Sequence, residues 1–82
     1  MATNYSAVTT ATHENIILGM FRKGASKNAT ATKAGIPIST FNRKINNTGD
    51  FTLRELGQIA EALELHLADI LPTELIASKD VA

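Results

Sequence analysis

The chain contains no cysteine, and this absence excludes several kinds of chemistry at once. Without thiols there is no disulfide framework, no thiolate zinc site and no cysteine nucleophile, and a reducing compartment is favoured. Long apolar runs are also missing, since none approaches the roughly 20 residues that a membrane-spanning helix needs. The N-terminal stretch lacks the basic start and apolar core of a secretory signal. These absences together predict a cytoplasmic protein that has no membrane partner.

The composition predicts one small ordered domain. Of the 82 residues, 44% are hydrophobic and 20% are charged, which is typical of a folded globule rather than a disordered segment. A chain of this length buries somewhat more than roughly 60% of its unfolded surface. There is no internal repeat and no Gly-Ser linker. We therefore expect a single domain over 12–72, a loose arm over 1–11 and a short tail over 73–82.

Acidic residues are absent from one third of the chain. The stretch 22–49 contains six basic side chains and no Asp or Glu, although the whole chain balances eight basic against eight acidic side chains. A neutral protein that concentrates its positive charge in this way is suited to a phosphate backbone. A basic cluster is also commonly just a solvated surface, so charge alone leaves nucleic-acid binding open. The six residues are Arg22, Lys23, Lys27, Lys33, Arg43 and Lys44.

Hydrophobic spacing predicts five short helices and no strand, which makes the fold class all-α. Thr10 or Thr12 is the expected N-cap of the first helix, and Thr52 with Glu55 three residues later forms a capping box for the fourth. The expected helices cover about 13–23, 27–34, 38–46, a stretch from Thr52 to Leu63, and 67–71.

Apolar residues at helical spacing define the expected core. They come from the first helix, from the turn and the third helix, and from one face of the fourth helix. The expected core residues are Ile16, Ile17, Met20, Phe21, Ile36, Phe41, Ile45, Leu53, Leu56, Ile59, Ala60 and Leu63.

The connection between the second and third helices has the chemistry of a tight turn. Gly35 just past a helix end permits a positive φ, and Pro37 suits the first turn of the next helix because no N–H is needed there. Ala31 is small enough to let the two helices approach closely. The sequence therefore predicts two helices joined by a short, sharply bent connection.

No set of residues points to catalysis, a metal site or a cofactor. There is no Gly-rich phosphate loop and no Ser-His-Asp set that the expected fold would bring together. His13 and His66 lack metal-ligand spacing, and each is expected at the surface or at a helix end. The carboxylates of the fourth and fifth helices are expected on solvated faces; these are Glu55, Glu61, Glu64 and Asp69. We therefore expect a protein that is not an enzyme.

Residues 26–71 resemble the helix-turn-helix domains of lambdoid repressors and Cro proteins, often called the XRE family. With the first helix the resemblance covers about 13–71, and the stretch 40–63 is similar to small actinobacterial phage regulators. It implies a compact five-helix, lambda-repressor-like domain. The matching features are Ala31, Ala34-Gly35-Ile36, Ser39-Thr40-Phe41, Leu56 to Leu63 and Leu67 to Leu71.

The resemblance implies a sequence-specific, double-stranded DNA-binding transcription regulator, most simply a phage repressor or Cro-like protein with helix 38–46 in the major groove. Arg43 would pair with guanine, Asn42 with adenine, and Ile38 would touch a thymine methyl. The expected base-contacting residues are Ile38, Ser39, Asn42 and Arg43. The expected contacts to the DNA backbone are Lys27, Asn28, Thr40, Lys44, Asn46, Asn47 and Thr48.

Four positions depart from the family's pattern. Thr30 and Lys44 stand where larger apolar residues are usual, and Ile45 is expected to replace Lys44 in the core. Glu64 replaces a common glycine, and His66 replaces a Ser or Thr cap.

A second class of function stays open, namely a protein-interaction module on the same fold, such as an antitoxin or a phage accessory factor. Its discriminating feature would be the apolar tail residues Leu75, Ile76 and Val81. Under the first reading a homodimer on DNA is a further expected partner, with the last helix and the tail as its pairing surface. The protein would then lie in a bacterial host's cytoplasm, on the nucleoid when bound.

Overall fold

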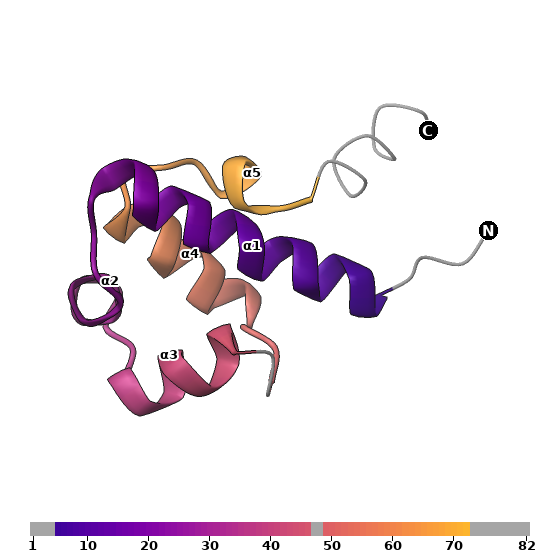
Figure 1. Cartoon of the computed structure of the whole chain (residues 1–82), viewed down its shortest axis with the longest axis horizontal. Coiled ribbons are helices and arrows are strands. Elements are labelled where there is room, and N and C mark those ends of the chain that lie inside the picture. Colours follow the sequence, from indigo (N-terminus) through magenta and orange to yellow (C-terminus); the bar gives the residue numbers. More distant parts are fainter. Residues whose placement is uncertain (1–4, 47–48, 73–82) are drawn as a thin grey trace.

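The computed structural model describes residues 5–46 and 49–72, and within these residues the chain is all-helical, with five helices and no strand. The all-α prediction is confirmed for this part of the chain. Figure 1 shows α1 running across the molecule in front of α4, with α5 along one side of α1 and α3 at the opposite edge of the fold. The helices are α1 Tyr5–Lys23, α2 Lys27–Ala34, α3 Ile38–Ile45, α4 Leu53–Ala62 and α5 Leu67–Ile70.

The first helix begins eight residues earlier than the sequence predicts. Residues 5–11 belong to α1, so the prediction of a loose arm is wrong for them. Val8 is buried, and the Thr12 hydroxyl donates to the Val8 carbonyl oxygen at 2.8 Å from inside the helix. Neither Thr10 nor Thr12 is therefore the N-cap. Burial of Val8 and Thr12 on the core side stabilises the extra turns, because tertiary packing outweighs the weak helix propensity of Ser and Thr.

The buried face of α1 differs from the expected one. Ile16 and Met20 are buried as expected, but Ile17 is 46% and Phe21 84% exposed. His13, expected at the surface or at a helix end, is 3% exposed in the middle of α1, and its ring packs edge-to-face with that of Phe51 at 5.3 Å between centroids. The helix α1 is therefore turned about its own axis relative to the prediction. His13 packs into the core, and Ile17 and Phe21 face outward.

The α2–α3 connection forms as predicted. The Ser26 hydroxyl accepts the Ala29 N–H at the start of α2, and Gly35 closes that helix with a φ of 74°. The Ile36 N–H then donates to the Ala31 carbonyl oxygen, so the chain reverses within one turn. Pro37 lies one residue before α3 rather than within its first turn. In Figure 1, α2 is seen end-on beside the start of α3, which lies across it.

Small side chains let α2 pack against both α3 and α4. Ala31 and Ala34 are buried, as is Thr30, whose hydroxyl donates to the Ser26 carbonyl oxygen. Thr30 is therefore buried without leaving its hydroxyl unsatisfied. Phe41 and Ile45 bury the inner face of α3, and Ile45 replaces Lys44 in the core as expected.

The second half of the core comes from α4 and α5. The Thr52–Glu55 capping box is present, and four of the five predicted apolar residues are buried: Leu56, Ile59, Ala60 and Leu63. The exception is Leu53, which is 68% exposed in the first turn of α4. The prediction that Leu53 belongs to the core is therefore wrong.

Two polar contacts position α5. The Asn15 amide donates to the Ile70 carbonyl oxygen at 2.8 Å, joining the end of α5 to α1. The His66 N–H donates to the Asp69 carboxylate at 3.1 Å, so Asp69 stabilises the helix start and is not merely solvated. Glu64 adopts a φ of 57°, the left-handed conformation that the missing glycine would supply.

Candidate nucleic-acid interface

One face of α3 is buried and the other is exposed, which fixes the direction in which each of its side chains points. Phe41 is fully buried and meets Phe51 at 5.7 Å between ring centroids, while Ile45 is 3% exposed. The four residues expected to contact bases are exposed: Ile38 at the border of the buried face, and Ser39, Asn42 and Arg43 on the outer side of the helix. They fall at positions i, i+1, i+4 and i+5, which share one side of a helix. The structure therefore brings all four together on one outward surface, which we call the α3 face.

The α3 face is polar with one apolar residue. Ser39 and Asn42 carry both hydrogen-bond donors and acceptors, and Arg43 contributes a planar guanidinium with five donors. Ile38, at the start of the helix, is 39% exposed. Such a surface offers hydrogen-bond donors and acceptors, one positive charge and one apolar contact within less than two helical turns.

The residues expected to contact the DNA backbone differ in their exposure. Lys27 and Asn28 are exposed in the first turn of α2, and Asn46 is exposed at the end of α3. Thr40 is half-buried. Asn47 and Thr48 lie outside the described residues. Lys27, Asn28 and Asn46 are therefore exposed at the ends of the two helices of the α2–α3 pair.

Lys44 is turned toward the fold and away from the α3 face. Its ammonium Nζ lies 2.8 Å from Oε1 of Glu55, and the two side chains are only 15% and 19% exposed. The same ammonium lies 6.0 Å from the centre of the Phe51 ring. Lys44 thus connects the end of α3 to the start of α4, and reaching a phosphate would require it to leave this ion pair.

The Glu55 carboxylate is held in its charged form. Burial by itself raises the pKa of Glu55, but hydrogen bonds from the Lys44 ammonium and the Thr52 N–H, with the positive charge of Lys44, outweigh it and hold the pKa below its ordinary value of 4.5. The expectation that solvation alone explains Glu55 is wrong. One oxygen of this carboxylate accepts both the Thr52 N–H and the Lys44 ammonium, each at 2.8 Å.

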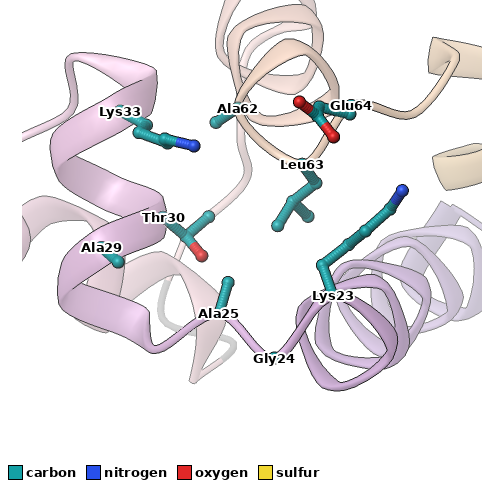
Figure 2. Close-up of a pocket in the computed structure, with 9 residues that line it drawn as sticks. All are labelled: Lys23, Gly24, Ala25, Ala29, Thr30, Lys33, Ala62, Leu63 and Glu64. Carbon is teal, nitrogen blue, oxygen red and sulfur yellow. The ribbon is translucent and has the colours of Figure 1, made fainter.

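A separate cavity of about 300 Å³ lies between the end of α1, α2 and the turn after α4. Its lining includes Lys23, Thr30, Lys33 and Glu64, and Figure 2 shows Lys33 and Thr30 projecting from α2, Lys23 from the end of α1 and Glu64 from the turn after α4. This cavity contains no residue of the α3 face. Lys33 therefore shares a hollow with an acidic residue and does not extend the α3 face.

The described residues contain no group of three or more His, Asp or Glu side chains that could hold a metal ion. Nor is any helix in the described ranges long and apolar enough to cross a membrane.

Sequence reasoning missed two features near the candidate interface. The Thr52–Glu55 capping box located Glu55 at the start of α4, but its pairing with Lys44, eleven residues earlier, depends on how α3 packs. The burial of His13 against Phe51 likewise depends on the rotation of α1. The sequence contained one indication of this ion pair: Lys44 is a basic residue at a position where an apolar residue was expected.

Comparison of the chain with protein-family models, with curated proteins and with solved structures found no match.

Proposed function

We propose that this protein is a sequence-specific, double-stranded DNA-binding transcription regulator of the lambda-repressor-like type, and not an enzyme. In this proposal α2 and α3 form a helix-turn-helix motif, and α3 lies in the major groove while α2 crosses the backbone. A phage repressor or Cro-like protein, which acts by occupying promoters, is the simplest regulator of this kind.

The observation that carries the proposal is the division of α3 into a buried and an exposed side. Phe41 and Ile45 are held in the core, so Ser39, Asn42 and Arg43 are presented to solvent on a short, rigid element. An ordinary surface helix also carries polar groups on its outer face, so it is the kind of groups on α3 that supports the proposal. These groups are the ones that read base edges in the major groove.

Each residue of the α3 face has a defined role in this proposal. Arg43 makes a bidentate contact to guanine, Asn42 pairs with adenine, and Ile38 contacts a thymine methyl group. Ser39 donates to or accepts from an adjacent base. Contacts to phosphates come from Lys27 and Asn28 at the start of α2, with Thr40 and Asn46 on α3.

Lys44 has a different role from the one that the sequence suggests. Because its ammonium is paired with Glu55, we assign it to positioning α3 relative to α4 rather than to a direct phosphate contact.

Fluorescence anisotropy with labelled duplexes of mixed sequence tests whether the protein binds DNA. We expect binding that weakens steeply as salt is raised, because bound Lys and Arg side chains release counterions. Arg43→Ala should weaken binding several-fold, whereas Lys23→Ala, which removes the same charge from the cavity side, should have a smaller effect. Circular dichroism of each variant confirms that the fold is retained.

Two results would contradict the proposal. One is the absence of binding even at low salt; the other is equal loss of affinity in Arg43→Ala and Lys23→Ala, which would leave only diffuse attraction. Either result would favour the interaction-module alternative, in which the partner is another protein.

A further inference from the structure

The C-terminal half of α1 carries an apolar surface that stays exposed among the described residues. Ile17 and Leu18 are 46% and 50% exposed, and Phe21 is 84% exposed. Ile16 and Met20, on the other side of the same helix, face the core. These three large apolar side chains lie within a stretch of five residues and on one face of the helix. An exposed apolar cluster of this kind is unusual for a surface that binds nothing.

An acidic and a basic residue, Glu14 and Arg22, lie at the two ends of this apolar surface on the same side of α1. Glu14, Leu18 and Arg22 are spaced four residues apart, so their side chains follow one another on the same side of α1. Glu14 and Arg22 are separated by about 12 Å along the helix axis, too far for them to pair with each other. Neither forms an ion pair with any residue in the described part of the chain.

The order acid, apolar, base is complementary to itself when the helix is reversed. If a second α1 lies antiparallel to the first with Leu18 at the crossing point, Glu14 of each copy meets Arg22 of the partner subunit. A parallel arrangement would instead place like charges opposite each other. This self-complementarity is what a two-fold symmetric contact requires, because the same patch must match itself.

We propose that the protein forms a symmetric homodimer through the exposed face of α1, antiparallel about Leu18. Ile17 and Phe21 cover the crossing point, and two equivalent Glu14–Arg22 ion pairs close its two ends. The occupant is a second copy because both the apolar centre and the reversed charges are supplied by one helix. The proposal does not depend on DNA binding, and it places the pairing surface on α1 rather than on α5 and the tail.

The expected dimer is weak. One pair of crossed helices buries less than the about 1,200 Å² that specific stable interfaces start from, so dissociation constants in the range of about 10–500 μM are expected. Sedimentation velocity of the full chain, from low micromolar to about 1 mM, spans this range.

Charge reversal provides a sharp test of the pairing. Glu14→Arg and Arg22→Glu should each raise the dimer dissociation constant by about tenfold, because each places like charges at two symmetric positions. The double variant with both changes should restore the wild-type constant. Phe21→Glu should abolish dimerisation, whereas Leu53→Glu, at an apolar residue that is also mostly exposed but lies on α4, should leave it unchanged.

Three outcomes would overturn the proposal. The first is a monomer at every concentration. The second is a dimer in which the double charge reversal does not rescue the single ones, which would place the contact elsewhere. The third is a lower melting temperature for Phe21→Glu than for wild type when both are dilute enough to be monomeric. Such a loss would mean that a segment of the same chain covers the α1 face.

Discussion

Lys44 Nζ and Glu55 Oε1 lie 2.8 Å apart, and this contact joins the last turn of α3 to the first turn of α4. The same oxygen accepts the Thr52 N–H that begins α4, so one carboxylate both caps a helix and holds the end of another. The direction in which the α3 face points therefore depends on a contact outside that face. A regulator that reads bases with α3 would need this positioning, since small rotations of the helix displace its side chains from their base edges.

We first predict that Lys44 and Glu55 are energetically coupled. Lys44→Met keeps the length of the side chain but removes the charge, and Glu55→Gln keeps the shape of the carboxylate. Each change should lower the free energy of unfolding by about 0.5–1.5 kcal/mol, and the double variant should lose less than the sum by about 0.5–1 kcal/mol. Urea unfolding at pH 7 measures all four members of the cycle. Lys27→Met with Glu55→Gln is the matched control, and strict additivity in the Lys44 cycle would refute the coupling.

The second prediction concerns pH. The pKa of Glu55 is lower in the folded chain than its ordinary value of 4.5, so the charged carboxylate stabilises the fold. This contribution is fully present above pH 4.5 and is lost as the pH falls through the lower, folded-state pKa. The stability difference between wild type and Glu55→Gln should therefore be constant near neutral pH and shrink below about pH 4.5. A difference that stays the same down to pH 3 would show that the ionised carboxylate is not the cause.

A third prediction tests the connection between α2 and α3. Gly35 has a φ of 74°, and no other atom lies within 4 Å of where a Cβ would stand, so backbone strain alone decides the cost of a side chain. Gly35→Val should lower the free energy of unfolding by about 2 kcal/mol, because β-branched residues strongly disfavour positive φ. Gly35→Asn should cost clearly less, since Asn tolerates this conformation. Thermal melts showing equal stability for the two variants would contradict the argument.

The fourth prediction is a stabilising substitution. Gly57 lies inside α4, and apart from its chain neighbours and the helix's own backbone no atom lies within 4 Å of a Cβ added there. Gly57→Ala should raise the free energy of unfolding by about 0.5–1 kcal/mol, because the unfolded chain loses conformational freedom and no clash is created. Gly24→Ala is the control: its surroundings are equally open, but a φ of 64° makes the same substitution destabilising. Chemical denaturation should give the two variants opposite signs.

The elements that were predictable from the sequence are those fixed by local chemistry. The bounds of α2, the left-handed Gly35 and the Thr52–Glu55 capping box depend on residues within one or two turns of each other. The start and rotation of α1 were not predictable in this way, because Val8 and His13 are buried by contacts with distant parts of the chain. The Lys44–Glu55 pair depends on how two helices meet, and a hydrophobic pattern contains no such information. The exposure of the four residues of the α3 face followed from the sequence because Phe41 and Ile45 were expected in the core, and their role as base contacts stays a prediction.

The fifth prediction concerns Arg43 as a base-reading residue. Arg43→Ala should weaken binding to the preferred duplex by about 1–3 kcal/mol and relax base preference at one position, as expected for a lost guanine contact. Lys27→Ala should weaken binding to all sequences to a similar extent and reduce the salt dependence, as expected for a phosphate contact. Anisotropy titrations on the preferred site and on a scrambled duplex separate the two. An equal loss on both duplexes for Arg43→Ala would mean that Arg43 contacts the backbone instead.

The most direct test of the central claim is an in vitro selection of binding sites from random duplex DNA, carried out in parallel with wild type and Arg43→Ala. We predict that the wild-type protein enriches a defined motif, and that the variant enriches the same motif with one position relaxed. A dimer on DNA would enrich an inverted repeat with half-sites about one helical turn apart. Failure of the wild-type protein to enrich any sequence would contradict the claim that α3 reads DNA.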